Sequence, residues 1–213
     1  MNLKWIRIEN ACLLLLLALL FWSLQPQEGY AAESPMEVIR TTTTQALAVL
    51  EDPSYRGEDR RRARIRQMWE VILPSFDERE IARRALGVYW RERTKEQRAY
   101  FTQLFIQLVK NSYSGTLDRY TEDAEFFFDS ERIDGDYAEV HTRIKTPAQF
   151  DAFEVVYRLH REDGRWLVHD IVAEHVSMVR NYRNQFARII NRSSFNGLME
   201  ALDEKVTALE NAS

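Results

Sequence analysis

Four histidines are the residues in this sequence best suited to acid–base or metal chemistry, and all of them lie in its second half. They are His141, His160, His169 and His175. Neutral imidazole is a common general base and a common ligand of transition metals, and neighbouring strands could bring some of these side chains together. An exported hydrolase that uses these histidines is therefore one open hypothesis.

No accompanying motif supports that hypothesis. The sequence has no HExxH zinc motif, no GxSxG nucleophile motif, no P-loop and no GxGxxG dinucleotide motif. Its single cysteine, Cys12, leaves no material for a cysteine-ligated zinc or an intrachain disulfide. Alternation along the expected strands turns His141 and His160 away from the apolar positions and toward solvent. We therefore expect no catalytic residue, no metal and no cofactor.

Two groups of arginines could contact an anion. Arg60, Arg61 and Arg64 belong to a basic run over residues 60–66, and Arg180 and Arg183 lie three residues apart on an expected helix. Either group could contact a lipid phosphate or an acidic partner protein. Either could equally pair with carboxylates of the same fold, and both readings stay open.

The composition excludes several classes of protein. The chain has 213 residues with 29 Lys and Arg against 33 Asp and Glu, and the net charge of −4 argues against a nucleic-acid partner. Apolar residues make up 45% of the chain, which is ordinary for one globular domain. We expect a single domain over residues 32–213.

An apolar block over residues 11–22 follows Lys4 and Arg7. A transmembrane helix needs about 20 apolar residues, whereas the core of a signal peptide needs about 7 to 15. Small residues at Gly29 and Ala31 are suited to cleavage after Ala31. We interpret residues 1–31 as a signal peptide, with an uncleaved anchor as the alternative. Both place the domain outside the cytoplasm.

Helical periodicity dominates the first half of the domain. A helix is expected from Pro35 to a stop at Asp52 and Pro53, and two more over 58–73 and 78–90. Thr94 and Gln97 form a capping box that opens the longest helix. Ser177 can cap a further helix, and a last helix over 195–209 is expected after a break near Asn196 and Gly197.

Apolar and polar residues alternate between these two groups of helices. The alternation predicts strands over 124–129, 136–146, 153–161 and 165–173, with a hairpin turn at Asp163-Gly164. The fourth strand is apolar on both faces, so its sheet is covered twice or borders an apolar cavity. The expected fold is α+β, with helices packed on a four-stranded antiparallel sheet.

Particular strings resemble one known family. They are FD at 76–77, IARRALGVYW at 81–90, TKEQ at 94–97, YRL at 157–159, GRW at 164–166, VSMV at 176–179 and NYRNQF at 181–186. In this order and spacing they resemble the MlaC or toluene-tolerance family of periplasmic phospholipid-binding proteins. The resemblance spans residues 38–202. His175 departs from it where the family usually has glycine, and Glu78 departs where the family often has an aromatic or apolar residue.

The resemblance implies a carrier without enzymatic activity. It implies a periplasmic protein that holds phospholipid in an apolar pocket between sheet and helices. The carrier would exchange lipid between an outer-membrane lipoprotein complex and an inner-membrane ABC transporter complex with an MCE-domain protein, and so maintain the lipid asymmetry of the outer membrane.

Physical chemistry agrees with such a role. About 30 methylenes in two acyl chains, at about 0.8 kcal/mol each, amount to about 24 kcal/mol against water, so a carrier must bury nearly all of them. The headgroup can stay near solvent, and we expect weak headgroup selectivity. From strand alternation and helical phase we expect the pocket to be lined by Trp90, Phe105, Val109, Val140, Tyr157, Val172 and Phe186. Another lipid, such as a hopanoid, and a scaffold that binds only protein are the alternatives beside the hydrolase.

Overall fold

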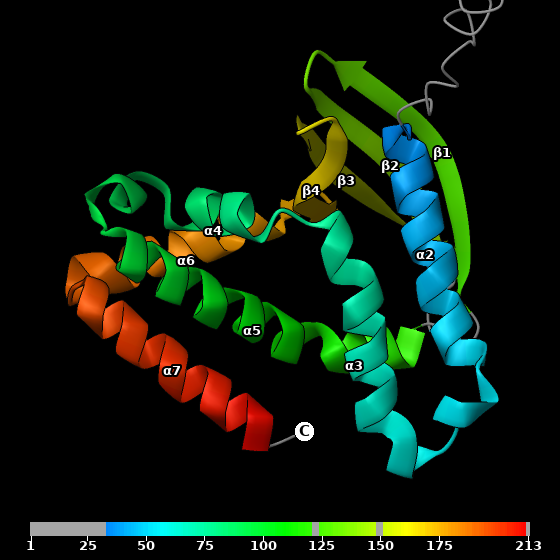
Figure 1. The fold of residues 1–213 in the computed structure, drawn as a ribbon, viewed down its shortest axis with the longest axis horizontal. Helices are drawn as coiled ribbons and strands as arrows, with labels where there is room; N and C mark the ends of the chain where they lie inside the picture. The colour runs from blue at the N-terminus through cyan, green and yellow to red at the C-terminus, as the bar shows by residue number, and fades with distance from the viewer. Residues whose placement is uncertain (1–32, 121–123, 148–150, 212–213) are drawn as a thin grey trace, which may run out of the picture. The chain divides into compact units, whose positions relative to one another are not determined.

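The computed structural model describes residues 33–120, 124–147 and 151–211 (Figure 1). All of them belong to one compact unit, Glu33–Ser213. The expected signal peptide lies outside the described residues. No helix among the described segments is long and apolar enough to cross a membrane.

Among the described residues six α-helices flank the strands, as the sequence predicts. The helices before the strands are α2 (Pro35–Glu51), α3 (Arg61–Ile72), α4 (Glu78–Leu86) and α5 (Lys95–Tyr120), and those after them are α6 (Met178–Arg192) and α7 (Phe195–Asn211). Short 3₁₀ turns join the early helices: η1 (Pro53–Tyr55), η2 (Glu58–Arg60), η3 (Leu73–Ser75) and η4 (Gly87–Glu92). The expected helices over 58–73 and 78–90 therefore each continue into a 3₁₀ turn.

Side-chain caps fix the starts of three helices. The Ser34 hydroxyl accepts the Glu37 amide at 3.2 Å, and Thr94 and Gln97 exchange two hydrogen bonds at 3.1 and 3.2 Å as a capping box. Ser177 caps α6 by accepting the Arg180 amide at 3.0 Å. Each of these bonds satisfies a backbone donor that the first turn leaves free.

The break before α7 lies earlier than the sequence predicts. Helix α6 ends at Arg192 with Ser193 as its C-cap, and Ser194 caps α7 by accepting the Gly197 amide at 3.1 Å. Gly197 is therefore inside the first turn of α7, where a Cβ atom would lie 2.2 Å from the Ser193 hydroxyl oxygen. The glycine marks close packing at a helix start and not the break itself.

The sheet has five antiparallel strands in the order of the sequence. They are β1 (Glu125–Asp134), β2 (Tyr137–Lys145), β3 (Phe153–Glu162), β4 (Arg165–Ala173) and the two-residue β5 (Val176–Ser177). The sequence-based count of four omitted β5, because two residues carry no alternation. Strand β1 also continues past the expected end at Asp129, since a register shift between Phe128 and Ser130 interrupts its pattern.

Helices cover the two faces of the sheet in different ways. On one face Val38 and Ile39 of α2 pack with Val140, Leu159 and other apolar residues of β2 to β4. Figure 1 shows α2 running beside β1 and β2. The other face contacts the starts of α4 and α6 near β4.

Two buried carboxylates hold those helix starts. Asp170, which is 5% exposed, accepts the Ser177 hydroxyl at 2.6 Å and the Val179 amide at 3.1 Å. The amide of Asp77 donates to the Val168 carbonyl at 2.9 Å, and its carboxylate caps α4 through the Glu80 amide at 2.8 Å. Hydrogen bonds to charged groups are roughly twice as strong as neutral ones, so both helices are firmly positioned.

A separate apolar core lies among the helices. Its centre is an aromatic group in which the Phe105 ring lies 5.1 Å from Phe186 and 5.0 Å from Tyr182. Phe101 stacks on Phe105 at 5.8 Å, and Trp90 belongs to the same core. Edge-to-face and offset contacts of this kind stabilise beyond the area they bury.

The turn between β4 and β5 places His175 in a left-handed conformation. Its φ is +64° and that of Glu174 is +46°. In this conformation the Cβ atom of a non-glycine residue lies close to the backbone, which destabilises the fold by about 1–2 kcal/mol. His175 is therefore a strained substitute for the glycine that such turns favour.

Replacing His175 by glycine is expected to raise the free energy of unfolding by about 1 kcal/mol, because glycine relieves the steric strain at positive φ. Denaturant unfolding at neutral pH measures the change. His175→Ala is the matched control, since it removes the imidazole and keeps the Cβ. Equal stability of the two variants would contradict the assignment of strain.

Candidate functional site: an apolar cavity beside the sheet

A cavity of about 440 Å³ lies between the sheet and the helices α2, α3 and α5. This volume falls within the roughly 300–1,000 Å³ of ligand sites in proteins. The sheet contributes Phe126, Ile144, Phe153, Tyr157, Ile171 and Ala173 to its lining. Helices α2, α3 and α5 contribute mainly Ile39, Ala46, Leu47, Met68, Trp69, Ile72 and Val109. The site is therefore apolar on all the sides that these elements form.

Helical and strand periodicities explain why these residues converge. Ile39, Ala46 and Leu47 share one face of α2, because residues seven or eight apart lie above one another on a helix. Ile171 and Ala173 alternate along β4 and so point to the same side of the sheet. Several lining residues, such as Ile144 and Ile171, are only partly buried, since they border the cavity and not a packed layer.

The polar residues of the lining are few. They are Thr42, Thr43, Ser75, Lys110, Thr116 and Asn181, beside the phenols of Tyr113 and Tyr157. Burial raises the pKa of Tyr157 to about 12, so this phenol stays neutral at physiological pH. Thr42 and Ser75 hydroxyls satisfy each other at 2.5 Å. Lys110 is the cationic residue among the described lining residues.

The structure places two of the seven expected lining residues in the cavity wall, Val109 and Tyr157. Trp90, Phe105 and Phe186 lie in the core among the helices. Helical phase alone cannot separate a residue that faces a core from one that faces a cavity, because both positions are apolar. The lining residues of α2 and α3 are apolar positions of the same kind, so the sequence does not distinguish them from core residues.

Val140 and Val172 were also expected in the cavity wall and are not among its described lining residues, each for a reason of its own. Val140 has no exposed surface and packs under α2. In the pairing of β3 with β4, Arg158 lies opposite Asp170 and Leu159 opposite Val168, so His169 is an extra residue in β4. A bulge of this kind shifts the alternation. Val172 is thus turned away from the face that carries Ile171.

The five arginines considered for phosphate or partner contact are not among the described residues that line the cavity. Arg60 lies 3.5 Å from Asp59 and Arg61 lies 4.0 Å from Glu58, as side-chain ion pairs. Arg64 donates to the Tyr55 carbonyl at 2.8 Å and so braces the turn before α3. Arg180 and Arg183 are exposed on α6.

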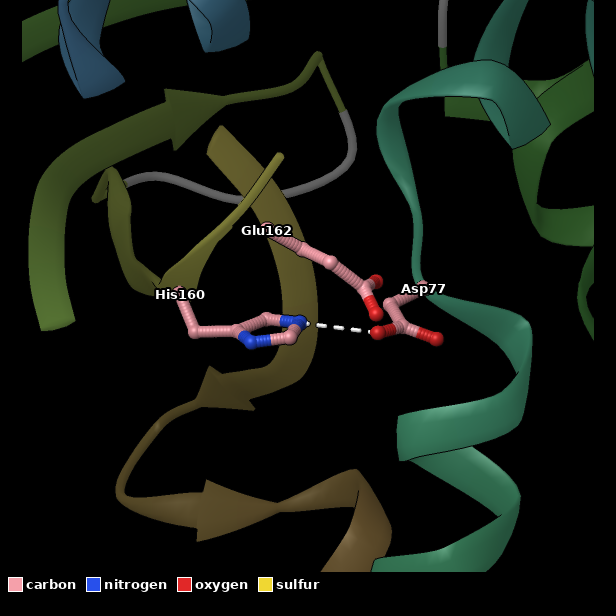
Figure 2. A group of neighbouring side chains, drawn as sticks. All are labelled: Asp77, His160 and Glu162. Atoms are coloured by element: carbon pink, nitrogen blue, oxygen red, sulfur yellow. Dashed lines mark hydrogen bonds and ion pairs between the residues drawn. The ribbon is translucent and has the colours of Figure 1, made fainter. Parts of the chain in front are cut away.

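A cluster of titratable groups lies on the other face of the sheet (Figure 2). His160 Nε2 is 2.8 Å from Asp77 Oδ2, and one ligand atom each of Asp77, His160 and Glu162 lie within 4.8 Å of one another. The expectation that His160 points to solvent is wrong, because its side chain is only 16% exposed under the start of α4. His141 is 36% exposed, beside Glu139 and Glu154.

The contacts of this cluster have a structural role. One oxygen of Asp77 caps α4 and the other binds His160, so Asp77 and His160 fasten α4 to β3. The His160 ring also makes an edge contact at 5.7 Å with the ring of His169. Three ligand atoms of this kind could hold a cation, but a cation would displace the bond between His160 and Asp77.

The fold and the cavity together define a class of protein: an α+β domain in which helices enclose an apolar cavity against one face of an open antiparallel sheet. The family model described as MlaC protein matches residues 40–204, which is most of the chain. The chain belongs to the MlaC family.

Similar proteins agree with this assignment. The chain is 26% identical over 174 residues to the toluene tolerance protein ttg2D of Pseudomonas putida, covering 81% of this chain and 80% of the relative. It is 22% identical over 140 residues to the intermembrane phospholipid transport system binding protein MlaC of Haemophilus influenzae, covering 64% and 65%.

A solved structure shares the fold. A phospholipid-binding protein from Ralstonia solanacearum, solved in complex with a phospholipid, superposes with a TM-score of 0.70 at 23% identity. The match covers 81% of this chain and 97% of that one. At this identity the likeness establishes the α+β architecture.

Burial of His169 predicts a pH-dependent stability. Its side chain is 5% exposed, its Nδ1 has no hydrogen-bond partner in the described part of the chain, and burial lowers its pKa from 6.5 to about 4. Arg84 and His160 also lower this pKa, whereas the carboxylates of Asp170 and Glu80 raise it. Between pH 6.5 and 4 the unfolded chain therefore binds a proton that the folded chain does not.

We expect this histidine to contribute a loss of about 2 kcal/mol of stability between pH 7.5 and pH 5. Denaturant unfolding at both pH values measures this loss in the wild type and in His169→Gln. The loss in His169→Gln should be smaller than that in the wild type by about 2 kcal/mol, because the variant lacks the buried imidazole. His175→Gln is the control, because that imidazole is 90% exposed. An equal pH dependence in the wild type and in His169→Gln would refute the buried neutral state.

Proposed function

We propose that the chain is a phospholipid carrier that holds acyl chains in the cavity between the sheet and α2, α3 and α5. The apolar lining of this cavity of about 440 Å³ is the observation that carries the proposal. The family assignment supports it, since the names of similar proteins refer to phospholipid binding and transport.

Burial of acyl chains in the cavity is favourable. Each methylene that leaves water contributes about 0.8 kcal/mol. Acyl chains that fill the cavity also cover apolar side chains that border it, such as Ile144 and Ile171.

The transfer of a lipid needs no covalent chemistry. Acyl chains that pass from a bilayer or a docked partner into the cavity exchange one apolar surrounding for another, so the free energy changes little. Tyr157 stays neutral and the other polar lining residues are hydroxyls and an amide, beside Lys110. We therefore propose a carrier that is no enzyme and uses no metal or cofactor, with phospholipid as its cargo.

The proposal extends to location and partners. We propose that residues 1–31 direct export to the periplasm. There the carrier would exchange lipid between an outer-membrane lipoprotein complex and an inner-membrane MCE-domain and ABC transporter complex, maintaining outer-membrane lipid asymmetry. The Haemophilus relative's name, which refers to intermembrane phospholipid transport, supports this extension.

Lipid occupancy should depend on the free space of the cavity. Val109→Trp and Ile171→Trp place an indole in the cavity from opposite walls, and each is expected to reduce the bound phospholipid by about half or more, because two bulky groups cannot share the volume. Native mass spectrometry of protein purified from the periplasm measures lipid per chain.

Thr207→Trp is the matched control, since Thr207 is exposed on α7. Both cavity variants must first show the far-ultraviolet circular dichroism of the wild type. Folded variants that carry as much lipid as this control would rule out the cavity as the site. Wild-type protein that carries no phospholipid would overturn the proposed function.

Export predicts a definite mature protein. Cleavage after Ala31 leaves Ala32 as the first residue and removes Cys12. Intact mass measurement of the protein from the periplasmic fraction is expected to give the mass of residues 32–213. A protein that keeps Met1 and sediments with membranes would show that residues 1–31 are an anchor.

A further inference from the structure

A second hollow of about 680 Å³ lies between the region around the start of α4 and one side of α5. Its lining is more polar than that of the apolar cavity and includes four cationic side chains, those of Arg79, Lys95, Arg98 and Lys110. Glu78 is the carboxylate in the described lining. We call this hollow the basic groove.

The basic groove adjoins the apolar cavity. Leu73, Ile106 and Lys110 line both hollows. Ile106 and Lys110 lie four residues apart and so share one face of α5. The two hollows therefore meet at these three side chains, and the polar one among them is a lysine.

The cations of the basic groove keep their charge available. Arg98 donates to the carbonyls of Trp90 at 2.9 Å and Arg91 at 3.2 Å, which hold its guanidinium without neutralising it. Within the described segments, no ion pair joins Arg79, Lys95 or Lys110 to a carboxylate.

Two carboxylates partly offset this positive charge. Glu78 belongs to the lining, and Glu210 of α7 accepts a hydrogen bond of 3.1 Å from the Gln107 amide at its edge. Four cations still outnumber these two anions. The lining therefore has an excess of positive charge beside an apolar cavity, an arrangement that is complementary to an anionic amphiphile.

We infer that the basic groove receives the anionic headgroup of a lipid whose acyl chains occupy the apolar cavity. The carrier should then prefer an anionic phospholipid to a zwitterionic one. A phosphodiester with an uncharged substituent gains from every cation of the groove, whereas the ammonium of a zwitterionic headgroup is repelled by them. This inference rests on the proposed function and replaces the expectation of weak headgroup selectivity.

Competitive loading tests the preference. The mature protein is stripped of lipid and incubated with vesicles of equimolar phosphatidylglycerol and phosphatidylcholine, then recovered and extracted for mass spectrometry. We expect phosphatidylglycerol to be enriched about threefold in the protein relative to the vesicles, because each partly exposed charge contributes little. The enrichment should fall toward one at about 0.5 M NaCl, where screening is strong.

Variants assign the preference to the groove. Arg79→Gln combined with Lys95→Gln should bring the lipid ratio in the protein close to that of the vesicles, and Lys110→Gln should do the same. Lys205→Gln is the matched control, since Lys205 is exposed on α7 and should leave the enrichment unchanged. The ratio is measured only on variants with the circular dichroism of the wild type.

The outcomes separate this inference from the proposed function. Lipid-loaded wild type without enrichment, or groove variants that keep the enrichment, would overturn the headgroup assignment and leave the carrier function standing. Protein that takes up neither lipid would overturn the carrier function itself. Calorimetry with inorganic phosphate on the lipid-free protein is the last arm. Binding at or below about 10 mM without enrichment of phosphatidylglycerol would make the groove a site for free anions and would overturn the inference.

Discussion

The structure depends on one constraint: the apolar face of the sheet must be kept from water while α2 covers only part of it. Where Val38 and Ile39 contact the sheet, Val140 has no exposed surface and the packing is complete. Elsewhere on that face Ile144 and Ile171 border the cavity. Core packing at native density would close such a space, so stability must come from elsewhere in the fold. The core among the helices, around Phe105, and the capped helix starts supply it.

Polar interactions on the opposite face of the sheet position α4 and α6. The buried carboxylate of Asp170 positions α6, and Asp77 positions α4 through its cap and its bond to His160. Directional hydrogen bonds to charged groups fix helix positions that apolar contacts alone would leave adjustable. One face of the sheet thus carries the polar contacts that position helices, and the other borders the apolar cavity that we propose as the lipid site. His160 and His169, which first suggested chemistry, lie on the polar face.

The bulge at His169 connects these two roles. Because it inserts one residue into β4, Val168 and Ile171 share the apolar face, and both His169 and Asp170 fall on the polar face. A regular strand would place Val172 toward the cavity instead of Ile171. The carboxylate that holds α6 and the isoleucine that borders the cavity are therefore consequences of the same irregularity. Bulges commonly redirect side chains next to functional sites in this way.

Local sequence determined the helices, four of the five strands and the family, because caps, stops and periodicity act within a few residues and need no distant partner. Thr94 with Gln97 predicts the start of one helix, and Ser177 predicts the start of another. The structure has both helix starts. The tertiary structure alone decided which apolar residues line a cavity. Trp90, Phe105 and Val109 carry the same apolar signal, yet only the arrangement of α2, α3 and α5 around the sheet leaves Val109 beside empty space. It also decided that His160 meets Asp77 and that Lys110 borders two hollows, since these residues come together only through the packing of separate elements.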